Sequence, residues 1–166
     1  MLNSMRILGI DPGLATIGLG YVDSLSAHDI RPCEWLTIET ASSQSAGDRL
    51  KEIRTDFSAF LVEVKPELAV VEKLFFAANR TNAFDVAQAR GVLLLCLAEA
   101  GIPYLEATPL QMKAAITGDG SATKRNVQDM LKLMLHLEAI PTPDDAADAL
   151  ALAVYGALRR DVALIG

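Results

Sequence analysis

Acidic residues at the ends of two apolar runs are the residues of this sequence best suited to do chemistry. Asp11 follows the apolar run 7–10 and precedes Pro12-Gly13, so the pattern predicts a buried strand that ends in a tight turn. Glu72 ends a second apolar run, 68–71. In open α/β sheets the functional site lies at the carboxyl ends of the strands. Both carboxylates are therefore candidate site residues.

A second pair of carboxylates lies near the C-terminus. Asp145 and Asp148 are three residues apart at the start of a predicted helix, so they share one helix face. Asp144 also lies about one turn from Asp148 and could take the place of Asp145.

Four carboxylates held together repel one another and raise each other's pKa unless a cation neutralises them. Oxygen ligands of this kind suit Mg²⁺ or Mn²⁺, and a pair of such ions can hydrolyse a phosphodiester. Each acid alone also fits an ordinary role, as a turn residue, a strand end or a charge at a helix N-terminus. Their combination in one α/β order favours the metal site.

The elements that must position these acids alternate between strand and helix. Three strands near 6–11, 17–23 and 34–40 are expected to form an antiparallel meander. The later elements are a helix at 45–64, a strand at 68–72, a helix at 82–101, a short strand at 103–105, and helices at 109–116, 123–136 and 144–160. The last helix has an Ala-rich face suited to close packing on a sheet. We expect an α/β fold with a mixed sheet.

The length of 166 residues fits a single domain, 1–166, and the apolar share of 51% with 22% charged residues excludes a disordered chain. The longest apolar stretch, 92–98, is too short to span a bilayer. No signal-peptide pattern precedes the first strand, so we expect a cytoplasmic protein.

Cys33 and Cys96 lack metal-ligand spacing and are predicted to be core thiols. The aromatic residues Trp35 and Tyr155 are also predicted to belong to the core.

The net charge of −6 argues against a nucleic-acid partner, because phosphate binding needs cations. The charge is compatible with such a partner if several acids form a metal site and the Lys and Arg residues gather on one face.

Five short motifs in order resemble the RuvC family of Holliday-junction resolvases. They are Asp11-Pro12-Gly13, Glu72 with Phe75-Phe76, Gln88-Ala89-Arg90-Gly91, the Gly-rich run 118–124, and the run 145–151. The resemblance implies a ribonuclease-H-like fold, an α/β mixed five-stranded sheet flanked by helices. It also implies a homodimer that cuts four-way DNA junctions by symmetric paired nicks in recombination and repair, using Mg²⁺ or Mn²⁺, with two ions per active site.

The four acidic positions of the family fall on Asp11, Glu72, Asp145 and Asp148, and we expect Asp11 to contact both metals. The family pattern favours Asp145 over Asp144, because the matching string begins at Asp145.

Lys113 and Lys124 match basic positions that the family uses near the scissile phosphate. Lys124 follows a Gly-rich turn that opens a helix, where amides and a cation can hold phosphate together. By spacing alone Lys113 is equally well a solvated helix cation. Phe75 matches an aromatic residue that stacks on a splayed base, and Phe76 is assigned to the core. Arg80 either contacts the DNA backbone or is solvated.

The apolar surface of helix 82–101 is wider than one sheet contact needs, in agreement with the family's dimer. The resemblance also suggests the RuvA and RuvB branch-migration complex as a partner. Lys73, directly after Glu72, departs from the family pattern and could alter sequence preference.

Three other functions share part of this sequence pattern. A ribonuclease-H-like nuclease acting on RNA or another branched substrate would carry similar acids. Sugar kinases and actin-like ATPases share the Asp-x-Gly turn, but they need a second domain and an adenosine loop, which this chain lacks. A noncatalytic junction-binding scaffold would not need all four acids.

Overall fold

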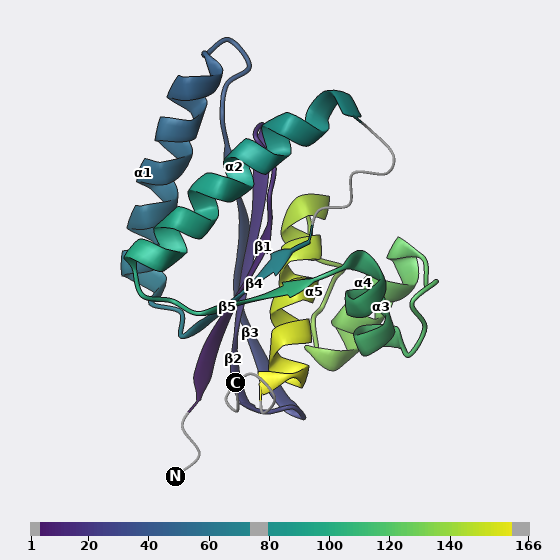
Figure 1. Ribbon diagram of the computed structural model, residues 1–166. Coiled ribbons are helices and arrows are strands. Elements are labelled where there is room, and N and C mark those ends of the chain that lie inside the picture. Colours follow the sequence, from purple (N-terminus) through teal and green to yellow (C-terminus); the bar gives the residue numbers. More distant parts are fainter. Residues whose placement is uncertain (1–3, 74–79, 161–166) are drawn as a thin grey trace.

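A five-stranded sheet in the order β3-β2-β1-β4-β5 forms the centre of the computed structural model, which describes residues 4–73 and 80–160 (Figure 1). The strands are β1 (Met5–Asp11), β2 (Thr16–Ser26), β3 (Asp29–Glu39), β4 (Leu68–Glu72) and β5 (Tyr104–Ala107). The helices are α1 (Ala46–Val64), α2 (Arg80–Glu99), α3 (Pro109–Thr117), α4 (Lys124–Met134) and α5 (Asp144–Leu158). The predicted α/β fold with a mixed sheet is confirmed.

The first three strands form the predicted antiparallel meander, and β4 and β5 add parallel neighbours beside β1. β3 begins at Asp29, earlier than the sequence predicts. Its first residues are mostly polar and include Pro32, so they lack the alternation that marks a half-buried strand. Their pairing with β2 makes them a strand, since an edge strand needs only one partner.

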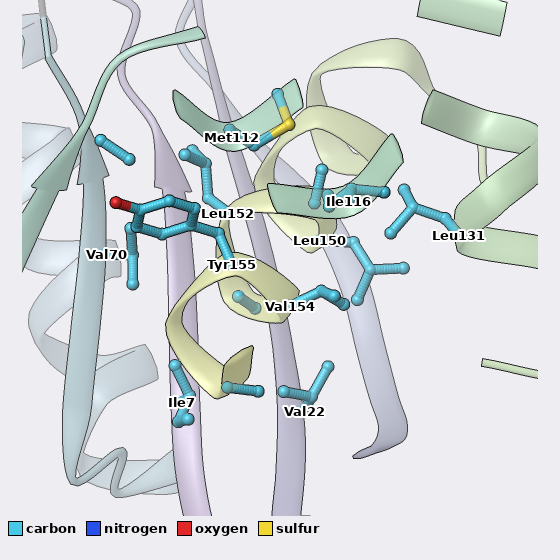
Figure 2. Packing of buried hydrophobic residues seen from close by; sticks show 14 of the residues in the cluster. Ile7, Val22, Val70, Met112, Ile116, Leu131, Leu150, Leu152, Val154 and Tyr155 are labelled. Carbon is cyan, nitrogen blue, oxygen red and sulfur yellow. The ribbon is translucent and has the colours of Figure 1, made fainter. Parts of the chain in front are cut away.

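Helices cover both faces of the sheet. α1 and α2 lie on one face, while α5, α3 and α4 lie on the other (Figure 1). The predicted apolar face of α1 is buried through Ile53, Phe57 and Leu61. Figure 2 shows the core on the α5 side, where Tyr155 and Leu152 of α5 lie near Val70 of β4. Two separate hydrophobic layers thus hold the sheet between the helices.

The α5 backbone lies directly against glycines of the sheet. A Cβ atom built on Gly18 would lie 2.0 Å from the backbone oxygen of Asp145, and one on Gly9 would lie 1.9 Å from that of Ala149. Only a residue without a side chain fits at either position. The Ala-rich face of α5, buried through Ala149 and Ala153, completes this contact as predicted.

The cysteine prediction is half right. Cys96 is buried, but Cys33 is exposed, because it lies on the edge strand β3. Tyr155 belongs to the core, whereas Trp35 is only half-buried and packs at the core margin. In the described part of the chain no helix has the length and apolar character needed to cross a bilayer.

We expect Gly18→Ala to lower the free energy of unfolding by about 1–3 kcal/mol, because the new methyl group would overlap the α5 backbone. It should also reduce the DNA cleavage that the family resemblance implies by on the order of 100-fold, since α5 carries Asp145. Urea unfolding and a cleavage assay measure the two effects.

Gly47→Ala is the matched control, because in the described part of the chain a Cβ at Gly47 of α1 would meet no atom within 4 Å outside its own stretch of helix. This variant should keep full activity and gain up to about 1 kcal/mol in stability. Equal behaviour of the two variants would contradict the proposed role of the close contact.

Candidate active site

Asp11 and Glu72 lie at neighbouring strand ends, as the sequence predicts. The parallel register pairs Ile10 of β1 with Val71 of β4, so the residue that follows each lies at the same edge of the sheet. The Glu72 carboxyl group raises the pKa of Asp11, through its charge and through side-chain hydrogen bonding. The two carboxyl groups therefore lie close together.

Arg90 of α2 fixes the end of β4. Its Nε donates to the backbone carbonyl of Glu72 at 3.3 Å, and its guanidinium also pairs with Glu106 of β5. The Lys73 N–H donates to the carbonyl of Ala107 at 2.8 Å, which continues the pairing with β5 past the strand end. These contacts hold the backbone from which the Glu72 side chain projects.

The start of α5 brings Asp145 and Asp148 to the same place. Gly18 pairs with Asp11 across β1 and β2 and is also the glycine against which the Asp145 backbone packs. The indole Nε1 of Trp35 donates to the carbonyl of Thr142 at 3.2 Å, just before the helix. Asp145 and Asp148 are both half-buried.

Burial and like charge act together on Asp11. Desolvation, the charges of Glu72, Asp148 and Asp145, and the hydrogen bond with Glu72 raise its pKa to about 8. Burial also raises the pKa of Glu72, and the charge of Asp148 adds to this, while the hydrogen bond with Asp11 opposes it. Without a cation, the pair therefore retains a proton near neutral pH.

Lys124 balances the charge on the other side of the cluster. Its Nζ lies 3.0 Å from Asp148 and 3.2 Å from Asp144. Partial burial lowers the pKa of this ammonium group, but the bonds to Asp148 and Asp144 outweigh burial and raise it. Burial raises the pKa of Asp148, and Lys124 opposes that rise.

The turn before α4 places Lys124. The Thr123 side chain caps the helix by accepting from the Asn126 N–H at 3.2 Å. Lys124 is therefore the first helical residue, one position after the predicted start at residue 123. Asp119 accepts from the Ser121 N–H at 2.8 Å within the preceding turn. Lys124 thus reaches the acids from a well-bonded loop.

Two pockets adjoin the acids. Lys113 and Lys124 line one of about 200 Å³ together with Glu72 and Asp148. Among the acids of α5, Asp145 but not Asp148 lines the second, of about 320 Å³, together with the following residues: Asp11, Pro12, Gly13, Leu14, Ala15, Thr16, Arg49, Asp85 and Val86. The acids therefore separate a lysine-lined pocket from one that contains an arginine.

The choice between Asp144 and Asp145 has a geometric basis. The Asp144 side chain is 69% exposed and pairs with Lys124. Asp145 is half-buried, shares a pocket with Asp11 and raises the pKa of Asp11 through its charge. Asp145 is thus the residue that faces the other acids.

Three predicted residues cannot be placed. Phe75 and Phe76 lie outside the described residues, and Arg80 begins α2 but its side chain is outside the described part as well. The predictions for them stay predictions. Arg49 and Asp85 are neighbours of the acids that sequence reasoning missed, because no spacing in the sequence links α1 or α2 to Asp11.

The donor set fits a hard divalent cation, since it consists of carboxylates that are costly to ionise together. Among the described residues, however, no three acidic, histidine or cysteine side chains converge closely enough to form a ready-made metal site. Without a metal, two features offset the negative charge of the acids. The raised pKa of Asp11 lets the Asp11–Glu72 pair keep a proton, and the Lys124 ammonium group pairs with Asp148.

A mixed sheet with carboxylates from β1, β4 and α5 at one edge defines the class of ribonuclease-H-like nucleases. The sequence matches the family model of the crossover junction endodeoxyribonuclease RuvC over residues 7–156. The chain therefore belongs to the RuvC family, whose members are metal-dependent nucleases.

Individual relatives agree with this family. A crossover junction endodeoxyribonuclease RuvC of Brevibacillus brevis is 47% identical over 94% of this chain and 93% of the relative. One from Gloeobacter violaceus is 45% identical over 92% of this chain and 87% of the relative. A solved structure of T. thermophilus RuvC in complex with Holliday junction substrate superposes with a TM-score of 0.84, at 32% identity, covering 95% of this chain and 96% of that one.

The raised pKa of Asp11 makes the metal-free protein less stable as the pH rises from about 4 to about 8, because only the folded state keeps the proton in that range. Asn carries no such proton. The stability gain of Asp11→Asn over wild type should therefore grow by more than about 1 kcal/mol from about pH 5.5 to about pH 8.5. Urea unfolding in EDTA at both pH values measures it.

Asp56→Asn serves as the control for removing an exposed carboxylate, here one on α1. A stability gain of Asp11→Asn that stayed constant with pH would contradict the prediction.

Proposed function

We propose that this protein is a metal-dependent endonuclease that resolves Holliday junctions in recombination and repair by symmetric paired nicks. The observation that carries the proposal is the gathering of carboxylates from β1, β4 and α5 beside Lys113 and Lys124. Acids supply metal ligands, and the lysines supply charge for a phosphate. A noncatalytic junction binder would have no use for so costly a cluster.

Asp11, Glu72, Asp145 and Asp148 are the residues that would hold two Mg²⁺ or Mn²⁺ ions, with Asp11 shared between them. When bound, such ions activate a water and stabilise the leaving oxygen in phosphodiester hydrolysis. The raised pKa of Asp11, to which Glu72 and Asp145 both contribute, supports this assignment.

Lys113 and Lys124 are assigned to the phosphate that is cut. Both line the pocket beside Glu72 and Asp148, and Lys124 enters it from the first turn of α4. Asp144 gives Lys124 a second partner, so the ammonium group can stay at the pocket when Asp148 takes another ligand. Lys113 and Lys124 then neutralise the negative charge that develops on the reacting phosphate.

Phe75 and Arg80 are proposed DNA contacts on the strength of the family resemblance. Phe75 would stack on a base at the branch point, a contact worth about 1–3 kcal/mol. Arg80 would contact the backbone. The proposed partners also include the RuvA and RuvB branch-migration complex, and we propose the cytoplasm as the place of action.

A homodimer would suit a junction with near two-fold symmetry. α2 supports it with an exposed stripe at alternating spacings of four and three residues, the pattern of a coiled-coil seam. The stripe consists of Phe84, Gln88, Gly91, Leu95 and Ala98. A Cβ on Gly91 would meet no atom within 4 Å among the described residues beyond its own stretch of helix, which leaves room for a second helix to approach.

The decisive test compares a synthetic four-way junction with linear duplex and RNA–DNA hybrid, in Mg²⁺ or Mn²⁺. Wild type should nick the junction alone, symmetrically in two strands. Asp11→Asn should bind the junction but cut it more than about 100-fold more slowly, beyond the roughly 10–100-fold typical of residues that only support a metal ligand.

Cutting of the hybrid in preference to the junction would favour the ribonuclease rival. Binding without cutting of any substrate would favour the noncatalytic junction-binding scaffold. Either outcome overturns the proposal.

Leu95→Glu should convert the dimer to a monomer, because it replaces the exposed Leu95 side chain of the proposed seam with a charge. Analytical ultracentrifugation at micromolar concentration measures the change. Leu133→Glu on α4 is the matched control, since Leu133 is also exposed but lies on another helix. A monomeric wild type would contradict the dimer.

A further inference from the structure

The pocket on the Asp11 side of the acids contains a cation that the proposed chemistry does not use. Arg49 of α1 lines this pocket with Asp11 and Asp145, whereas Lys113 and Lys124 line the other. The two pockets have no lining residue in common. α1 lies on the opposite face of the sheet from α3 and α4 (Figure 1). The linings of the two pockets therefore place the cations on two sides of the acids.

Arg49 is held in place by neutral hydrogen bonds. Its Nε donates to Thr40 Oγ1 at 2.8 Å, and that hydroxyl group donates to the Leu14 carbonyl at 2.6 Å. The Thr40 N–H donates to the Ala15 carbonyl at 3.0 Å, and Thr40 is only 9% exposed. This chain of bonds ties the guanidinium group to the loop that directly follows Asp11.

The rest of the guanidinium group is available to a ligand. Among the ion pairs of the described residues none involves Arg49. Asp85 lines the same pocket but makes no ion pair with Arg49 there. A half-buried arginine that is anchored through Nε presents its two terminal nitrogens in the fork that matches a phosphate.

We propose that Arg49 binds a backbone phosphate of the cleaved strand, next to the scissile phosphate and on the side away from Lys113 and Lys124. The inference rests on the proposed function, since a nucleic-acid strand has phosphates on both sides of the cut. Cations on both sides of the acids fix the register of the strand, which aligns the phosphate that reacts. Arg49 is thus a binding residue that positions the substrate.

The carboxylates of the same pocket limit when this contact forms. Asp11, Asp145 and Asp85 oppose an anion, and a divalent cation at the first two removes much of that opposition. The contact is therefore best measured in Mg²⁺. Asp11→Asn serves as the background, because it stops cutting and removes one of these charges.

The test is the binding of a fluorescent four-way junction by Asp11→Asn protein with and without Arg49→Gln, followed by anisotropy over a range of salt concentrations. We expect the affinity to fall about 3–10-fold and the slope of log K against log salt to decrease by about one, the signature of one lost phosphate contact. Unchanged affinity and slope would overturn the inference.

Arg54→Gln is the matched control. Arg54 lies on the same helix but pairs with Glu99 at 3.1 Å and lines a different pocket. Its variant should leave both the affinity and the salt slope unchanged. Equal losses of junction affinity in the two variants would show that Arg49 acts only through its general positive charge, and this would overturn the inference.

A second arm identifies the phosphate. Junctions that carry one neutral methylphosphonate are prepared for each position flanking the cut. The effect of Arg49→Gln should vanish at one flanking position and persist at the others, because the partner charge is then already absent. If the effect of Arg49→Gln persisted at every position, or if this variant unfolded at a lower temperature, Arg49 would have a structural role and the inference would be overturned.

The two proposals fail separately. If wild type cuts the junction while Arg49→Gln binds it normally, only the Arg49 inference is overturned. If wild type cuts no junction, the proposed function fails whatever Arg49 does to binding.

Discussion

The approach of the α5 backbone to the first two strands is the contact on which the active site depends. Gly18 lies opposite Asp11 in the sheet and leaves room for the backbone oxygen of Asp145, so one glycine joins two site residues. Gly9 does the same one turn along the helix, at Ala149. A side chain at either position would lift α5 and separate its carboxylates from those of the strands. The small residues of this contact therefore set the geometry of the acids, although they carry no chemistry.

The close contact has an electrostatic consequence, because it gathers like charges in a partly dry place. The protein relieves the repulsion in two ways. The pKa of Asp11 is raised to about 8, so its carboxyl group keeps a proton near neutral pH, and Lys124 pairs with Asp148. A metal ion could replace both, since the proton can leave and the Lys124 ammonium group can turn to another partner. The proton and the ammonium group therefore lower the electrostatic cost of the acid cluster in the metal-free protein, and a divalent cation would lower it further.

The sequence predicts the strand-borne half of the site well, because Asp11 and Glu72 each end an apolar run and a parallel register follows from the α/β order. It also predicts the start of α4 to within one residue and the small-residue face of α5. What it cannot predict depends on tertiary packing. Arg49 reaches the acids only because α1 folds back over the face that ends at Asp11, and its anchor, Thr40, has no distinctive spacing from it. Cys33 was assigned to the core because a cysteine carries no signal for an edge strand, and the early part of β3 lacks an apolar pattern.

The acidic net charge of the chain and its proposed DNA substrate are compatible once the charges are located. The carboxylates at the sheet edge are the ones that a metal would neutralise, so they count against DNA only in the metal-free protein. Other acids are paired within the fold, such as Asp23 with Arg6 at 2.8 Å and Glu99 with Arg54. The cations beside the acids come from three separate helices, with Arg49 on α1, Lys113 on α3 and Lys124 on α4. The field that a DNA strand would meet is therefore set by this local arrangement, and a bound metal ion would reduce the repulsion at the acids.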